Sequence, residues 1–128
     1  MASVADILGP QGRIAQRLTK YEDRPEQLAL SQEIERALAE GGHLLAEAGT
    51  GVGKSFAYLV PAILRVLDDP NRHLEASDEI SAKAKRRIVI STHTVSLQEQ
   101  LLAKDIPLLR SIMPDEFTAV CQRSRQLP

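Results

Sequence analysis

A glycine-rich stretch that runs into lysine and serine contains the residues best suited to chemistry. It reads Ala48-Gly49-Thr50-Gly51-Val52-Gly53-Lys54-Ser55. Glycines have no Cβ, so the backbone can turn tightly and direct its N–H groups inward, where they can bind an anion. Lys54 adds a full positive charge for the β- and γ-phosphates of a nucleotide, and the hydroxyl of Ser55 is the expected magnesium ligand. The pattern therefore predicts a phosphate-binding loop.

The sequence on either side of this loop supplies the elements that would hold it. His43-Leu44-Leu45 is a short apolar run that can form a buried strand, and residues 56–67 are apolar and long enough for a helix. A strand, a glycine-rich turn and a helix that starts at the lysine and serine are the context that a phosphate loop requires. The match departs from the usual pattern at Ala48, which replaces the first glycine. The alternative is a glycine-rich connection that binds nothing.

Three apolar segments and the helices between them predict an α/β fold. The expected strands lie near residues 43–47, 88–92 and 117–120. Helices are expected from Pro25 to the glycine pair at 41–42, after Ser55, and around residues 97–102. We expect Pro61 to kink its helix without ending it, and Pro107 to end the helix before it. Alternating strands and helices favour a parallel sheet with flanking helices.

Two groups of polar residues have both a functional and a structural interpretation. Gln27 lies near the start of a helix, where its amide can stay in solvent or can donate to and accept from the edge of an adenine ring. Thr92, His93 and Thr94 follow a predicted strand, at the edge where open α/β sheets bind ligands. They can equally form a turn and cap the next helix. The basic residues between 83 and 87 are either a solvated start of a strand or a phosphate contact.

Composition indicates a globular chain of one domain. The 128 residues are 43% hydrophobic and 26% charged, which is enough to bury a core of aliphatic side chains. The net charge of −1 argues against a dedicated basic nucleic-acid module, although it allows a local contact surface. The single cysteine, Cys121, cannot form an internal disulfide and fits a reducing cytoplasm. No signal-peptide pattern and no membrane-spanning apolar stretch is evident, so we expect a cytoplasmic location and no membrane partner.

Three blocks of the sequence resemble the DinG-type helicases, bacterial relatives of the XPD helicases in superfamily 2. Tyr21 with Arg24-Pro25-Glu26-Gln27 resembles the family's adenine-sensing Q motif. Residues 47–61 resemble motif I with its helix, and residues 90–101 resemble motif Ia, which touches the DNA backbone in the family. The blocks cover roughly residues 5 to 120, and their combination is specific.

The resemblance implies a partial RecA-like phosphate-loop domain that takes part in ATP-dependent unwinding of DNA. The implied nucleotide-binding residues are Tyr21, Arg24, Gln27 and the loop from Ala48 to Ser55. Within this set, Lys54 and Ser55 carry the catalytic contacts to the phosphates and to magnesium. Thr92, His93 and Thr94 are implied to lie near single-stranded DNA. ATP, magnesium and single-stranded DNA are thus the implied ligands, and the oligomeric state is left open.

What this sequence lacks limits the activity that we expect. The family's Asp-Glu-Ala-His box, which supplies a second magnesium ligand and a water-activating glutamate, has no match here. The cysteines of the family's iron–sulfur cluster are also absent from the sequence, and so is a second motor domain. Hydrolysis needs a positioned water and stabilised charge around the γ-phosphate, and a phosphate loop alone supplies neither completely. The isolated chain is expected to bind nucleotide at most.

Two other functions are open at this point. The chain can be a non-enzymatic nucleotide-binding remnant or a decayed gene product, which the residue count favours for the isolated chain. It can also belong to another class of phosphate-loop NTPase, such as a small kinase. A kinase would need acceptor-site residues and an arginine-rich lid, and neither is evident in the sequence.

We divide the chain into a leading segment at 1–20, a partial helicase ATP-binding domain at 21–120 and a tail at 121–128. The resemblance stops at Val120. Codons exist for which a shift of one nucleotide turns the tail into Val-Lys-Gly-Arg-Gly-Asn-Tyr, the family's next segment. The hypothesis is that the tail is out of frame, and the alternative is a natural short tail. The hypothesis predicts a disordered tail and a marginally stable, aggregation-prone domain.

Overall fold

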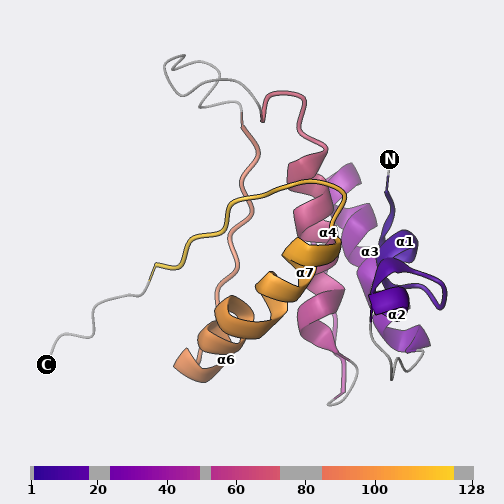
Figure 1. Ribbon diagram of the computed structural model, residues 1–128, viewed down its shortest axis with the longest axis horizontal. Helices are drawn as coiled ribbons and strands as arrows, with labels where there is room; N and C mark the ends of the chain where they lie inside the picture. The colour runs from indigo at the N-terminus through magenta and orange to yellow at the C-terminus, as the bar shows by residue number, and fades with distance from the viewer. Residues whose placement is uncertain (1, 18–23, 50–52, 73–84, 123–128) are drawn as a thin grey trace, which may run out of the picture.

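The chain folds into a set of packed helices, and two apolar segments, at 88–92 and 117–120, extend from them (Figure 1). The computed structural model describes residues 2–17, 24–49, 53–72 and 85–122. Two long helices, α3 (Pro25–Glu40) and α4 (Lys54–Leu67), lie against each other at its centre. The short helix α1 (Val4–Leu8) packs on both of them, and α2 (Arg13–Arg17) packs on α1.

The predicted α/β class is wrong for this structure. The described residues contain no β-strand, and the three segments expected as strands, at 43–47, 88–92 and 117–120, are irregular chain. Several of their apolar side chains face solvent: Leu45 is fully exposed, and Val89 and Val120 are 90% and 88% exposed. A strand bonds its backbone only to a neighbouring strand, and these segments form no such ladder in the described part of the chain. The predicted parallel sheet and RecA-like architecture are therefore corrected to a helical arrangement.

The hydrophobic core lies where α1, α4 and α7 (Ile106–Ile112) meet, and α3 packs against α4 beside it. Its fully or nearly fully buried side chains are aliphatic, as the scarcity of aromatic residues predicts. Within this cluster, the residues with the lowest exposure are Val4, Ile7, Leu8, Leu59, Val60 and Leu109. The first of these come from α1, a helix that the sequence pattern did not lead us to expect. The backbone N–H of Val4 also donates to Glu35 Oε2 on α3 at 3.1 Å, which ties α1 to the central pair of helices.

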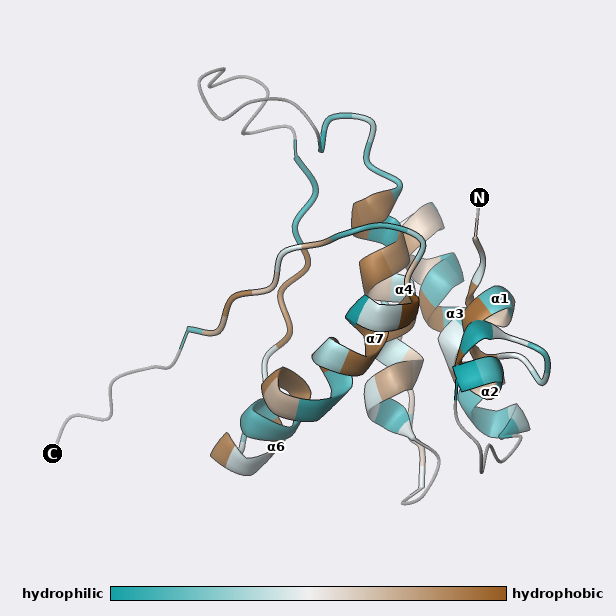
Figure 2. Cartoon of the chain, viewed as in Figure 1, coloured by the Kyte–Doolittle hydropathy of each residue, from teal (hydrophilic) through white to brown (hydrophobic). Residues whose placement is uncertain are grey.

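Helix α4 forms because its apolar side chains recur on one face, and Figure 2 shows brown hydrophobic stretches along it. Pro61 lies inside the helix and is itself buried, and the helix continues past it to Leu67. The prediction that Pro61 does not end this helix is confirmed. The helix ends at Asp68, as the run of turn-forming residues from 68 to 71 predicts.

The helical arm after residue 94 runs through three consecutive elements. These are α6 (Val95–Gln100), the π-helix η1 (Leu101–Asp105) and α7. Pro107 was predicted to end the helix before it, and this is wrong, because the backbone at Leu101, Asp105 and Ile106 stays helical. A proline removes one N–H donor and its ring crowds the carbonyl four residues earlier. Directly before Pro107 the helix takes a π-helical turn, in which the N–H of Ile106 bonds to the carbonyl of Leu101. The sequence pattern did not reveal the π-helix.

Helix α3 begins and ends as predicted. Pro25 occupies its first turn, where the missing N–H costs nothing, and Gly41 and Gly42 follow its last residue with φ angles of 81° and 96°. None of the helices in the described ranges has the length and apolar character needed to cross a bilayer.

Candidate functional site

The start of α4 is the centre of the candidate site. Its N-cap is Gly53, which has a left-handed backbone with φ 81° and ψ 50°. A Cβ at this position would lie 2.2 Å from Nε2 of Gln27 and 3.0 Å from Nη1 of Arg24. Both the backbone angle and the space around it therefore require glycine.

Gln27 connects α3 to this turn. Its side chain is 5% exposed, and its Nε2 donates to the carbonyl oxygen of Gly53 at 2.9 Å. The structure thus brings together three predicted site residues, Arg24, Gln27 and Gly53, which lie up to 29 positions apart in the chain. Sequence reasoning placed Gln27 at an adenine ring and missed its contact with the loop. The adenine contact itself stays a prediction.

Lys54 and Ser55 form the first turn of α4, directly after the glycine. The Lys54 side chain is exposed, and that of Ser55 is half-buried. The N-terminus of a helix of 14 residues carries partial positive charge and unpaired N–H groups, both of which favour a phosphate. A lysine ammonium and a serine hydroxyl beside them have the chemistry that phosphate and magnesium require. The donor set therefore fits a magnesium nucleotide.

The rest of the predicted loop is described only in part. Ala48 and Gly49 lie in irregular chain before the turn, whereas Tyr21 and the residues from Thr50 to Val52 lie outside the described residues. A cavity of about 400 Å³ opens beside the loop. It is lined by Leu30, Ile34, Leu44, Ala46, Glu47, Ala48, Lys54 and Tyr58. This hollow brings residues from α3, the loop and α4 to one place.

The residues predicted to lie near DNA form a turn that starts α6. Thr94 is the N-cap, and its Oγ1 accepts a hydrogen bond from the N–H of Leu97 at 3.2 Å. Thr92 Oγ1 donates to the carbonyl oxygen of Thr94 at 3.5 Å, and His93 is exposed. The side chain of Thr94 thus has the capping role that the sequence left open. A nucleic-acid role for Thr92, His93 and Thr94 stays a prediction.

A carboxylate that sequence reasoning passed over holds the loop after α4. Asp69 is 6% exposed and accepts from the N–H groups of Arg86 at 2.7 Å and Asn71 at 3.0 Å. The hydrogen bond from Arg86 does most to lower the pKa of Asp69 below its usual value, and the bond from Asn71 lowers it further. The bond to Asn71 is an Asx-type turn, which the spacing of Asp and Asn after a helix can signal. The bond to Arg86 joins residues 17 positions apart and has no local sequence signal.

Arg86 belongs to the basic residues for which the sequence allowed a phosphate contact. Its Nη1 donates to the carbonyl oxygen of Arg65 at 3.2 Å and lies 3.8 Å from Oδ2 of Asp68. Part of the basic cluster is therefore used inside the protein, at the end of α4. Lys83 lies outside the described residues, so the cluster as a whole is not tested.

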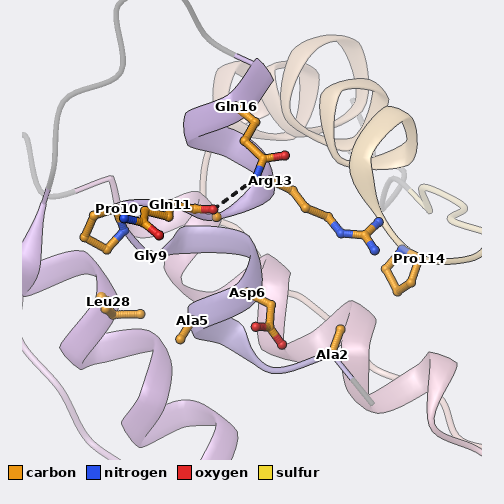
Figure 3. A pocket seen from close by; sticks show the side chains of 11 residues that line it. Ala2, Ala5, Asp6, Gly9, Pro10, Gln11, Arg13, Gln16, Leu28 and Pro114 are labelled. Atoms are coloured by element: carbon orange, nitrogen blue, oxygen red, sulfur yellow. Dashed lines mark hydrogen bonds between the residues drawn. The ribbon is translucent and has the colours of Figure 1, made fainter.

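A larger and more open hollow lies beside α1 and α2, away from the predicted site residues (Figure 3). Its volume is about 920 Å³, and none of the predicted site residues lines it. Three of its four polar side chains are already used: Asp6 accepts from Ser3, Gln16 donates to the carbonyl of Gln11, and Arg13 donates to the carbonyl of Ile112. This hollow therefore offers few free groups for recognition of a ligand.

Among the described residues, no group of three or more His, Cys, Asp or Glu side chains is placed to hold a metal ion. The expected magnesium ligand in this chain is the hydroxyl of Ser55, and serine is not one of these four residue types.

Comparison with known proteins finds relatives that all have DinG in their names. The chain is 40% identical over 105 residues to the ATP-dependent DNA helicase DinG of Salmonella typhimurium, which covers 80% of this chain and 13% of that protein. It is 35% identical over 115 residues to the ATP-dependent DNA helicase DinG of Escherichia coli, covering 88% of this chain and 14% of the relative. The 3'-5' exonuclease DinG of Bacillus subtilis is 32% identical over 111 residues, or 87% of this chain and 10% of that protein. No family profile and no solved structure matches the chain.

Proposed function

We propose, from the premise that this chain is a DinG-type helicase segment, that it binds a magnesium nucleotide at the start of α4. Two of the relatives named above are ATP-dependent DNA helicases by name, so we propose ATP as the nucleotide. The chain spans between 10% and 14% of the length of these three relatives, so helicase activity is proposed only for a larger assembly of which this segment is the nucleotide-binding part.

The observation that carries the proposal is the hydrogen bond from Gln27 to Gly53. A glycine-rich connection that binds nothing has no need of a buried amide 26 positions away that holds its last glycine. The contact fixes the residue whose left-handed backbone starts α4, and it thereby fixes where Lys54 and Ser55 begin the helix. Support for the phosphate site thus comes from two helices and not from the motif alone.

Within this proposal, the residues have separate roles. Lys54 and the N–H groups at the start of α4 bind the phosphates, and the hydroxyl of Ser55 binds the magnesium ion. Gln27, Arg24 and Tyr21 are assigned to adenine, and Thr92, His93 and Thr94 are assigned to single-stranded DNA. Without the acidic box, the isolated chain binds ATP but neither turns it over appreciably nor unwinds a duplex.

Calorimetric titration of the chain with Mg-ADP and Mg-ATP tests the binding. Replacing Lys54 by alanine removes a charged donor to phosphate, and we expect affinity to fall about ten- to a hundredfold. Lys104→Ala is the matched control, because Lys104 is an exposed lysine on η1 and is not part of the proposed site.

Equal affinity of Lys54→Ala and the wild-type chain would refute the assignment. Phosphate release by the wild-type chain that rises with single-stranded DNA and disappears in Lys54→Ala would instead refute the proposed lack of turnover. The two results are read from separate assays, so each part of the proposal can fail alone.

A further inference from the structure

The segment that contains α1 and α2 links the two long helices to the arm that runs from α6 to α7. Its first helix, α1, packs on both α3 and α4. The buried side chains of α1 are Val4, Ile7 and Leu8, and each is at most 2% exposed. The N–H of Val4 also donates to Oε2 of Glu35 on α3 at 3.1 Å. Because both long helices form the surface on which α1 packs, its position depends on how they lie against each other.

The turn between α1 and α2 is a rigid connection. A Cβ added at Gly9 would lie 2.5 Å from the carbonyl oxygen of Ala5, and one added at Gly12 would lie 2.7 Å from that of Ile7. The N–H of Gly12 also donates to the carbonyl oxygen of Gly9 at 2.9 Å. Closely packed backbone of this kind transmits a displacement instead of absorbing it as a hinge does. The two short helices therefore move as one unit.

Arg13 on α2 is the polar contact between this unit and the arm. Its Nη1 donates to the carbonyl oxygen of Ile112, the last residue of α7, at 2.8 Å. Figure 3 shows the Arg13 side chain reaching from α2 to Pro114, just beyond α7. The last carbonyls of a helix lack partners within it and carry partial negative charge, so arginine is a favoured donor there. Ile14 of α2 adds an apolar contact, because it belongs to the same core cluster as Ile112.

We propose that residues 2–17 form a strap that transmits nucleotide binding at the start of α4 to the arm, with Arg13 as its positioning residue on α7. This inference rests on the proposed function. A nucleotide bound at Lys54 restrains the start of α4 and, through the hydrogen bond of Gln27, α3 as well. The surface under α1 then loses freedom, and the strap passes this restraint to α7. The arm begins at the turn capped by Thr94, so the strap connects the two proposed sites.

Hydrogen exchange followed by mass spectrometry tests the strap on the full 128-residue chain, with and without Mg-ADP. Calorimetry first establishes the nucleotide concentration that saturates each variant. In the wild-type chain we expect exchange to slow in α3 and α4, and by about fivefold or more in the arm at 95–113. In Arg13→Ala the slowing in α3 and α4 should remain, while the slowing in the arm should disappear.

Three variants serve as matched controls or as an independent break of the strap. Arg13→Lys keeps a charged donor at the end of α7 and should restore the slowing in the arm. Arg17→Ala removes an exposed arginine from the same helix and should keep the wild-type response. Glu35→Ala removes the acceptor of the Val4 N–H at the other end of the strap, and we expect the same loss in the arm as in Arg13→Ala. Its own control is Glu40→Ala, which removes an exposed carboxylate from the same helix.

The outcomes separate this inference from the proposed function. Slowing in the arm that is as large in Arg13→Ala as in the wild-type chain, or that is absent from the wild-type chain, overturns the inference alone. Exchange in the arm of Arg13→Ala that is faster by the same factor with and without nucleotide also overturns it, because Arg13 then only stabilises the fold. Circular dichroism verifies that each variant is folded, and Glu35→Ala decides the question if Arg13→Ala is not. Absence of nucleotide binding to the wild-type chain in calorimetry overturns the proposed function, and this inference with it.

Discussion

Helix α4 and the segment 88–92 are both rich in aliphatic side chains, yet they differ in burial. Val60 of α4 is completely buried, whereas Val89 is 90% exposed. The difference lies in the backbone: a helix bonds its own N–H and C=O groups, while an extended segment needs a neighbouring strand. Figure 2 shows hydrophobic colour in the unpaired segments around 88–92 and 117–120 as well as in the helices. In this comparison, the element that completes its own hydrogen bonds buries its apolar side chains, and the one without a partner strand leaves Val89 exposed.

The largest test of this contrast replaces one leucine in each region by alanine. Leu109 on α7 is completely buried, and its truncation should lower the free energy of unfolding by about 2–5 kcal/mol. Leu45 is fully exposed, so the same change there should stay within about 0.5 kcal/mol. Urea unfolding followed by circular dichroism measures both. A comparable loss in Leu45→Ala would show that the segment 43–47 is packed in solution.

A smaller effect is expected at Gly53, where the irregular chain meets the start of α4. Gly53→Ala puts a Cβ at a left-handed position and against Gln27, which should cost about 2–4 kcal/mol of folding free energy. Gly49→Ala is the matched control, because no atom lies within 4 Å of its added Cβ.

A double-mutant cycle separates the two causes at Gly53. If the contact matters, Gly53→Ala and Gln27→Ala together cost about 1 kcal/mol less than their sum, because the shorter side chain makes room for the Cβ. Strict additivity would mean that only the backbone angle is strained and that Gln27 does not hold the turn.

The smallest effect concerns the end of α4 and is seen only in acid. The pKa of Asp69 is lower in the folded protein, so its hydrogen bonds contribute stability above its unfolded pKa, and this is lost as pH falls through the folded value. Below about pH 4, Asp69→Asn should therefore lose less unfolding free energy per pH unit than the wild-type chain. Glu40→Gln controls for the lost charge. An identical acid slope in Asp69→Asn and the wild-type chain would contradict this.

Helices α3 and α4 were predictable because their signals are local. Pro25 and the glycine pair mark α3, and the continuation of α4 past Pro61 follows from the apolar run on both sides. The strands failed because a β-branched run indicates only that a segment is suited to pairing, and pairing depends on other parts of a chain. Pro107 was misread for a similar reason, since the π-helix that accommodates it has no residue pattern of its own.

The candidate site was predictable as far as its motif extends. Lys54 and Ser55 follow from their spacing to the glycines, and the structure places them at the start of α4. The contact of Gln27 with Gly53 joins residues 26 positions apart. Such contacts depend on how helices pack, and no spacing rule encodes them.

The hydrogen bond between Asp69 and Arg86 has a consequence for how this chain can vary in length. It joins residues 69 and 86, so the two ends of the sequence between them are fixed to each other. The entropy of closing a loop rises only with the logarithm of its length, so each doubling of the intervening sequence costs about 0.6 kcal/mol. Inserts of very different size between these points should therefore be tolerated while α4 and the following arm keep their places. The same junction is a suitable position for grafting a reporter peptide or a small foreign domain.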